Sequence, residues 1–285
     1  MKYNNSNKPM VCMMTQSTCY RGTGIMSIKG ILWHSTGANN PELRRYVQPA
    51  DNASNKSELL TKIGKNQYGN DWNHVSVEAG LNAWIGKLAN GTVTTIQTMP
   101  WNYRPWGCGA GSRGSCNNGW IQFEICEDNL SDGNYFMQAY KEACELTAYL
   151  CKMYNLNPKG TVSFNGVNVP VILCHKDSSN LGLGSDHSDV YHWFNKYGKT
   201  MDNVRADVAA LVNGSSGSIT PSDGGNSGGG SSTPNSSKPM IGKGDSGSYV
   251  EELQKGLLKL GYSLPQWGAD GDFGNETYAA VIKFQ

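Results

Sequence analysis

Hydrophobic and polar residues alternate along parts of the first two hundred residues with the period of a β-strand. The clearest case is WIQFEIC at residues 120–126, where apolar side chains occupy one face and polar side chains the other. Residues 28–34 and 169–175 are also rich in β-forming residues, and each segment ends at a histidine. Residues 84–96 predict a hairpin that turns at an Asn-Gly pair.

Two longer segments repeat their apolar residues at helical spacing. Residues 135–154 and 201–212 each gather apolar side chains along one stripe. Strands that alternate with helices predict an α/β protein whose sheet carries helices on its faces. The histidines that end the first and third strands, His34 and His175, are then expected at one edge of the sheet, where α/β proteins usually build their sites.

This pattern stops between residues 213 and 238. The segment 213–238 consists mostly of Gly, Ser and Pro, so it cannot bury an apolar face and is predicted to be a flexible linker. It separates a first domain, residues 1–212, from a second, residues 239–285. In the second domain, apolar residues at helical spacing lead up to Gly261 and begin again near Ala280, which predicts a small helical module.

Composition and charge narrow the classes of function. Charged residues make up 16% of the chain and the formal net charge is +1, which argues against a nucleic-acid binder that works through bulk positive charge. No apolar run approaches the roughly 18 residues of a membrane span, so we expect no membrane insertion. Residues 1–10 lack the apolar segment of a signal peptide, which predicts a protein made in the cytoplasm.

Eight cysteines are spread along the chain, and none of them forms a Cys-x-x-Cys pair. A structural zinc ribbon is therefore not expected, and buried free thiols are the favoured interpretation. A bridge between Cys108 and Cys116 stays open.

Histidine and aspartate are concentrated in one late segment. Three of the five histidines lie within residues 175–192, together with Asp177, Asp186 and Asp189. Neutral imidazole and carboxylate are ligands that suit Zn²⁺. A polar surface loop can have the same composition, so both interpretations stay open at this point.

Three motifs in a fixed order give this segment a context. ILWHSTGANNP, then GWIQFEICED, then LCHKD followed by SDHSDVYHWF, resemble the zinc-dependent N-acetylmuramoyl-L-alanine amidases of the amidase-2 and peptidoglycan-recognition-protein superfamily. The likeness is greatest to the branch found in clostridial phages and prophages, and it covers most of residues 10–212. It implies an α/β fold with a mixed central sheet flanked by helices.

The resemblance also implies a set of zinc ligands. The family pattern I-x-x-H-x-[ST]-G falls on His34, and the G-H-x-D-like motif falls on His175. The third ligand of relatives, in K-x-[DC], corresponds to Asp189, with Asp186 as the alternative because the loop length differs. Two imidazoles and one carboxylate leave one position of Zn²⁺ open, as in catalytic sites.

Two catalytic groups are implied in the same way. Glu124 fits the carboxylate of the family's I-G-[IF]-E as a general base, and the alternative is a salt-bridged structural glutamate. His187 stands where relatives usually carry a lysine that stabilises the oxyanion, and an imidazole can donate in its place. Gly107 is a second departure, because many relatives have histidine there; Trp106 or Tyr103 could compensate.

Aromatic residues near the exit of the predicted hairpin are candidate substrate contacts. Trp101, Tyr103 and Trp106 either pack in the core and loops or line a groove for glycan and stem peptide. His74 has either a structural role or a place in the same groove.

Residues 241–285 resemble the peptidoglycan-binding type-1 module, through IGKGDSGSYVEELQ, DGDFG and the final FQ. That family continues past the final Phe-Gln with another turn and helix. We therefore expect a truncated module of marginal stability.

Taken together, the resemblances imply a zinc-dependent, endolysin-like amidase. It is expected to cleave the amide between the lactyl group of N-acetylmuramic acid and L-alanine, with peptidoglycan as partner, after release from the cytoplasm. Two alternatives stay open: a non-catalytic peptidoglycan-recognition protein, and a hydrolase of an amide within the stem peptide.

Overall fold

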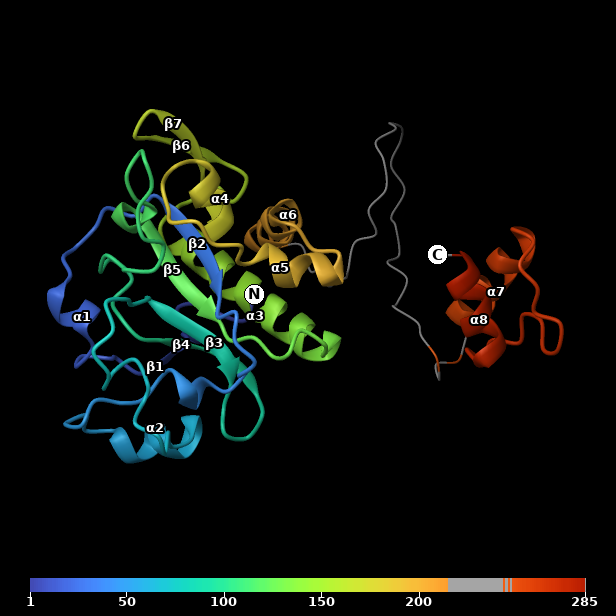
Figure 1. Ribbon diagram of the computed structural model, residues 1–285, viewed down its shortest axis with the longest axis horizontal. Helices are drawn as coiled ribbons and strands as arrows, with labels where there is room; N and C mark the ends of the chain where they lie inside the picture. The colour runs from blue at the N-terminus through green and yellow to red at the C-terminus, as the bar shows by residue number, and fades with distance from the viewer. Residues whose placement is uncertain (215–242, 244–245, 247, 285) are drawn as a thin grey trace. The chain divides into compact units, whose positions relative to one another are not determined.

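A six-stranded mixed sheet forms the centre of the N-terminal part of the protein in the computed structural model (Figure 1). The structure describes residues 1–214, 243, 246 and 248–284. The chain divides into two compact units, Met1–Ser222 and Asp223–Gln285. Apart from its first two residues, the predicted linker 213–238 lies outside the described residues.

The sheet has the strand order β1-β4-β3-β5-β2-β8. Its strands are β1 (Met10–Val11), β2 (Gly30–Ser35), β3 (Ala83–Lys87), β4 (Val93–Gln97), β5 (Trp120–Ile125) and β8 (Ile172–Cys174). Only β3 and β4 pair antiparallel, as the predicted hairpin; the other neighbours are parallel. This arrangement confirms the expected mixed sheet.

Because side chains alternate along β2 and β5, one face of the sheet packs in the main core and the other face carries the candidate site residues. The two strands pair in parallel, with His34 opposite Glu124. Trp33 and Phe123 point to the side of helix α3 (Gly133–Met153), with ring centroids 5.1 Å apart in the main core. Since successive strand residues point to opposite faces, His34, Gln122 and Glu124 share the other face.

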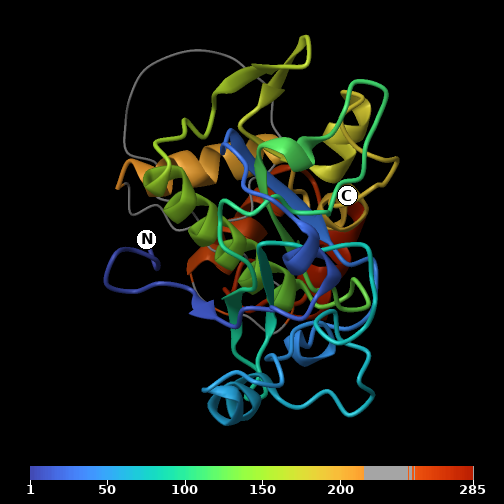
Figure 2. The ribbon, with the colours of Figure 1, turned by 90° about the vertical axis from the view of Figure 1, so that its left-hand side faces the viewer.

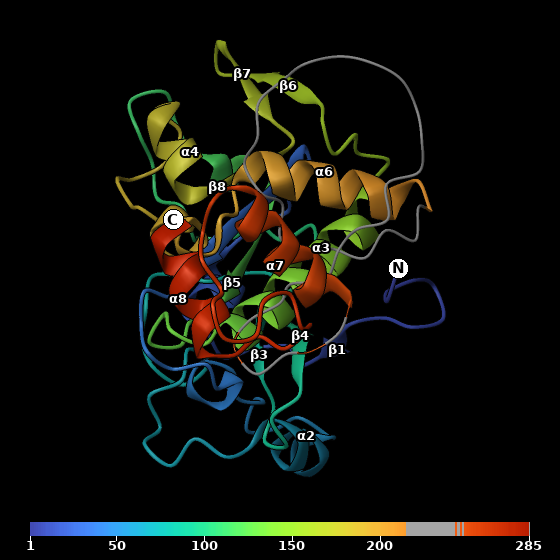
Figure 3. The same cartoon turned by 90° about the vertical axis from the view of Figure 1, so that its right-hand side faces the viewer.

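Helices cover the packing face. The two main ones, α3 (Gly133–Met153) and α6 (Met201–Val212), confirm the predicted helices and pack against each other beside the sheet (Figure 3). Asp132 caps α3 by accepting from the N–H groups of Asn134 and Tyr135. The remaining helical elements of this unit are α1 (Thr18–Gly22), η1 (Leu43–Arg45), α2 (Lys56–Ile63), η2 (Cys116–Asn118), α4 (His175–Asn180), α5 (Tyr191–Phe194) and η3 (Asn195–Tyr197).

The sequence predicts one strand over the apolar run 169–175, and this prediction is wrong. Its start belongs to β7 (Val167–Pro170), which pairs with β6 (Thr161–Phe164) in a separate hairpin, and its middle forms β8. His175 is the first residue of α4. The run is divided because Val169 pairs with Val162 outside the main sheet. The β6–β7 hairpin lies at one end of the unit and α2 at the other (Figure 2).

All eight cysteines are buried free thiols, which confirms the favoured interpretation and leaves Cys108 and Cys116 unbridged. Burial raises the pKa of the Cys108 thiol. Among the described residues, no helix has the length and apolar character that crossing a membrane requires.

The described residues of the C-terminal unit form two helices, α7 (Ser248–Lys259) and α8 (Asn275–Phe284), as predicted. A small apolar cluster that includes Leu257 and Ala280 holds them together. The buried amide of Gln254 donates to Asp270 (2.8 Å) and accepts from the backbone N–H of Gly271 (2.8 Å). The amide thereby ties the loop between the helices to α7.

Candidate metal centre and active site

The topology of the sheet brings two histidines to one edge. His34 lies near the carboxyl end of β2, and His175 follows β8 directly. Strands β2 and β8 are parallel neighbours, with Trp33 opposite Cys174, so both histidines come to the same end of the sheet. Both side chains are buried, and their rings meet edge to face with centroids 4.8 Å apart.

Asp189 joins this pair from the segment that follows α4. Its Oδ2 lies 3.1 Å from Nδ1 of His34, and its Oδ1 lies 3.3 Å from Nδ1 of His175. The backbone N–H of Lys176 donates to the carbonyl of Asp189 (2.9 Å), which holds the segment against α4. Candidate ligand atoms of the three residues all lie within 4.8 Å of one another.

The electrostatics of Asp189 favour its ionised form. Burial by itself raises the pKa of a carboxyl group, but hydrogen bonding with the rings of His175 and His34, in the forms that carry a proton on Nδ1, outweighs burial and lowers the pKa of Asp189 below its ordinary value. An ionised carboxylate between two imidazole nitrogens is a donor set that suits Zn²⁺.

Each imidazole uses its other nitrogen for a separate hydrogen bond. Nε2 of His34 lies 2.9 Å from Oε1 of Gln122, and Nε2 of His175 lies 3.2 Å from Oγ of Ser185. In both rings Nδ1 therefore faces Asp189, and Nε2 faces a second polar side chain, Gln122 or Ser185. Metal-binding histidines commonly engage their second nitrogen in this way.

The other candidate third ligand, Asp186, does not join the cluster. It is exposed, and its carboxylate pairs with the ammonium group of Lys176 at 2.9 Å. The hydrogen bond from Lys176 accounts for the lowered pKa of Asp186.

His187 lies directly beside the cluster. It is exposed, and its ring stacks on that of His175 with centroids 4.4 Å apart and an interplanar angle of 25°. Its Nδ1 lies 3.1 Å from Oγ of Ser185. The hydroxyl group of Ser185 therefore lies within hydrogen-bond distance of both rings.

Glu124 lies next to His34 in the sheet, on the same face. It is half-buried, and no group among the described residues forms a hydrogen bond or ion pair with its carboxylate. Burial, and then the nearby charges of Asp189 and Glu127, raise its pKa well above the ordinary value. The geometry therefore does not support the alternative of a salt-bridged structural glutamate.

The predicted substrate contacts lie in different surroundings. Trp106 lines a pocket of about 360 Å³ with Asn117 and three other residues, Glu78, Arg104 and Gly109. Tyr103 is half-buried and packs against Tyr20 with ring centroids 5.3 Å apart. Trp101 is buried in the main core, and His74 pairs with Asp71 (2.8 Å). The structure therefore does not bring Trp101 and His74 to the cluster.

Two polar residues at the site were not singled out by the sequence analysis, Gln122 and Ser185. Gln122 was detectable because it shares the polar face of its strand with Glu124. Ser185 lies in a segment without periodicity, and nothing in its sequence context identifies it.

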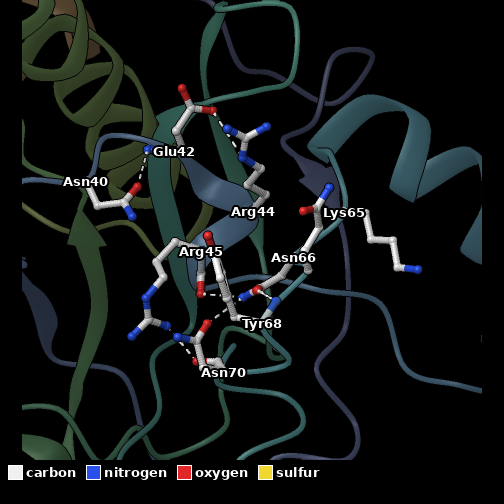
Figure 4. Close-up of a pocket in the computed structure, with 9 residues that line it drawn as sticks. Asn40, Glu42, Arg44, Arg45, Lys65, Asn66, Tyr68 and Asn70 are labelled. Atoms are coloured by element: carbon white, nitrogen blue, oxygen red, sulfur yellow. Dashed lines mark hydrogen bonds and ion pairs between the residues drawn. The ribbon is translucent and has the colours of Figure 1, made fainter.

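A separate pocket of about 440 Å³ lies around η1 (Figure 4). Its lining residues are Asn40, Glu42, Arg44, Arg45, Lys65, Asn66, Gln67, Tyr68 and Asn70. Two pairs of its polar side chains contact each other: Arg44 with Glu42 at 3.8 Å, and Asn66 with Asn70 at 3.0 Å. None of these lining residues belongs to the predicted site.

Comparison with known proteins identifies two segments of the chain. Residues 25–191 match the family described as "N-acetylmuramoyl-L-alanine amidase", and residues 246–285 match the family described as "Putative peptidoglycan binding domain". The first segment contains His34, His175 and Asp189.

Similar proteins carry related names. A "Probable N-acetylmuramoyl-L-alanine amidase" of Bacillus licheniformis is 31% identical over 162 residues, covering 57% of this chain and 38% of the relative. N-acetylmuramoyl-L-alanine amidase CwlL of the same species is 32% identical over 168 residues, covering 58% and 39%. This chain matches less than half the length of both relatives. The crystal structure of Staphylococcus aureus hydrolase AmiA in complex with its ligand is 20% identical, with coverage of 75% and 83% and a TM-score of 0.42.

Proposed function

Because the chain belongs to the N-acetylmuramoyl-L-alanine amidase family, we propose that its N-terminal unit hydrolyses peptidoglycan. The bond cleaved is the amide between the lactyl group of N-acetylmuramic acid and the L-alanine of the stem peptide. One observation carries this proposal: His34, His175 and Asp189, far apart in sequence but all within the matched segment, converge at one end of the sheet.

The cofactor in this proposal is Zn²⁺, with Nδ1 of His34, Nδ1 of His175 and a carboxylate oxygen of Asp189 as its ligands. The donor set supports it, because both Nε2 atoms already have partners and Asp189 favours its ionised form. Zinc in such a site acts as a Lewis acid on a carbonyl oxygen and makes water more acidic.

Glu124 is the proton carrier in this proposal. Its carboxylate takes a proton from the water that attacks the amide carbon. It then delivers that proton to the nitrogen of the leaving amine as the carbon–nitrogen bond breaks. Three observations support the role. Glu124 lies beside His34, no group among the described residues pairs with its carboxylate, and its pKa is raised. The products are a lactyl carboxylate and a stem peptide with a free N-terminal alanine.

His187 is proposed to donate a hydrogen bond to the oxygen that gains negative charge during the attack. Its exposed ring, stacked on His175, supports this role. Trp106 is proposed to contact glycan or stem peptide from the pocket that it lines. Substrate contacts by Tyr103, Trp101 and His74 stay predictions.

The second unit is proposed to bind the bacterial cell wall, because residues 246–285 match a peptidoglycan-binding family. Covalent connection to a wall-binding unit raises the effective concentration of an enzyme at its substrate. The cell wall is therefore the proposed site of action.

Mass spectrometry of digested peptidoglycan tests this proposal. Intact stem peptides with N-terminal alanine and uncleaved glycan chains are the expected products. Asp189→Ala is the inactive comparison, and Asp186→Ala is the matched control, since Asp186 lies outside the cluster. Fragments cut within the stem peptide identify a different amidase. Wall binding without any released product identifies a recognition protein, and either outcome contradicts the proposal.

A further inference from the structure

A buried amide connects the candidate zinc ligand His34 to η2, the short helical turn that precedes β5. Oε1 of Gln122 lies 2.9 Å from Nε2 of His34, and Nε2 of Gln122 donates to Oδ1 of Asn117 at 2.9 Å. Gln122 is fully buried, and Asn117 is 5% exposed. The three side chains therefore form a continuous hydrogen-bonded chain that ends at the metal centre.

The direction of this chain is determined by the backbone. Oδ1 of Asn117 also accepts from the backbone N–H of Gly107 (3.3 Å) and of Cys108 (3.1 Å). A backbone N–H can only donate, so the atom of Asn117 at this point must be its oxygen. Gln122 must then present its NH₂ group to Asn117 and its oxygen to His34.

This orientation determines which nitrogen of His34 carries the proton. An amide oxygen can only accept, so Nε2 of His34 must be the N–H donor. A neutral imidazole has one such proton, and Nδ1 is then left with a lone pair. Asp189 acts in the opposite sense, because its Oδ2, 3.1 Å from Nδ1, can attract the proton to the nitrogen that a metal needs.

We propose that Gln122 and Asn117 are positioning residues that keep Nδ1 of His34 unprotonated and available to Zn²⁺. The inference rests on the metal centre of the proposed function. It assigns the two residues no contact with substrate, only control of the tautomer and orientation of a ligand.

The position of Gly107 agrees with this inference. A Cβ atom at residue 107 would lie 2.3 Å from Oε1 of Gln122 and 3.1 Å from Nε2 of His34. No side chain fits there while Gln122 holds His34. Glycine at 107 and glutamine at 122 are therefore two parts of one arrangement.

The test compares two buried glutamines in the full-length protein. Gln122→Met removes the acceptor while keeping the approximate shape of the side chain. Gln48→Met is the matched control, because Gln48 is 5% exposed and its amide donates to backbone carbonyls of Val47 and Gly64, away from the cluster. Zinc affinity is measured by competition with a chromophoric chelator. Nitrogen-15 NMR of the histidine rings in the metal-free protein reports the tautomer.

We expect Gln122→Met to lower zinc affinity by about 10- to 100-fold and to move the His34 proton from Nε2 to Nδ1. Gln48→Met should leave both unchanged. Gln122→Glu keeps an acceptor beside His34 and should retain zinc affinity and tautomer much better than Gln122→Met. This result separates positioning from a general packing role.

Two results would overturn the inference. One is a folded Gln122→Met variant with unchanged tautomer and zinc affinity; the other is a wild-type His34 that carries its proton on Nδ1. If the wild-type protein binds no zinc, the proposed metal centre fails, but the NMR comparison still decides whether Gln122 sets the tautomer. The two failures are thereby distinguishable.

Discussion

The two histidines of the candidate metal centre are held in different ways. On the strand side, Nε2 of His34 meets the amide oxygen of Gln122, which is buried and oriented by Asn117. On the loop side, Nε2 of His175 meets the hydroxyl group of Ser185. An amide oxygen only accepts, whereas a hydroxyl group rotates and can donate or accept.

The two histidines of the cluster therefore differ in how strictly their protons are positioned. The strand side fixes the proton on one nitrogen of His34. On the loop side, Ser185 also contacts His187 (3.1 Å) and the carbonyl of Cys108 (3.3 Å), so several arrangements of its proton are allowed. The comparison teaches that a rigid ligand and an adaptable one can share a single carboxylate, Asp189.

Removing that shared carboxylate should have the largest effect, because both histidines contact it. Loss of a residue that hydrogen-bonds a zinc ligand lowers zinc affinity by up to about 100-fold. Asp189→Ala removes a proposed ligand itself, so it is expected to lower zinc affinity by more than this and to eliminate wall lysis. Zinc content after dialysis and turbidity of a cell-wall suspension measure both effects. Asp186→Ala should behave as wild type. Stoichiometric zinc in Asp189→Ala would exclude Asp189 as a ligand.

Replacing the proton carrier should separate zinc binding from catalysis. Glu124→Gln keeps the shape of the side chain but cannot accept the proton, so the rate of stem-peptide release should fall by about 10²- to 10⁴-fold. Zinc affinity should stay within several-fold of wild type, because Glu124 is not among the proposed ligands. A variant that retains the wild-type rate would remove Glu124 from the mechanism.

The contrast between the two sides predicts unequal losses of zinc affinity. Ser185→Ala should lower affinity by less than about tenfold, below the effect expected for Gln122→Met, because Ser185 is only half-buried and water can replace its hydroxyl group. The same chelator competition measures both variants. Equal losses would show that the two hydrogen bonds contribute alike and would break the comparison.

A smaller effect, on the free energy of unfolding, is expected at the contact between His192 and Glu127. Nε2 of His192 lies 2.8 Å from Oε1 of buried Glu127, which follows β5. The hydrogen bond to Glu127 raises the pKa of His192 above its ordinary value of 6.5. A raised histidine pKa stabilises the fold fully below the unfolded pKa, and this stabilisation is lost as pH rises through the folded pKa.

His192→Gln should therefore cost about 1 kcal/mol of unfolding free energy at pH 5.5 and less at pH 9. Urea denaturation of the metal-free protein, followed by circular dichroism, measures both values. An equal cost at the two pH values would show that the charge of His192 contributes nothing.

The strand side of the site was largely predictable from sequence. Period-two alternation fixes which residues of β5 face the core, and parallel pairing then brings Glu124 beside His34. The prediction was wrong for residues 169–175, because a local apolar run does not reveal that Val169 pairs with β6 outside the main sheet.

The loop side was less accessible to the same reasoning. Whether Asp186 or Asp189 turns inward depends on the bond from Lys176 N–H to the Asp189 carbonyl, which spacing alone cannot supply. Gln122 stood on a predicted polar face, but its partner Asn117 comes from η2, a single short helical turn that the sequence pattern did not predict. Orientation of a side chain by backbone groups in such a segment requires coordinates.

A crystal structure of the zinc-loaded protein, with anomalous data at the zinc absorption edge, tests the central claim most directly. The account predicts one peak per chain, at about 2.0–2.2 Å from Nδ1 of His34, Nδ1 of His175 and a carboxylate oxygen of Asp189. Zinc at another set of residues, or bound through Nε2 of His34 with Gln122 displaced, would contradict it.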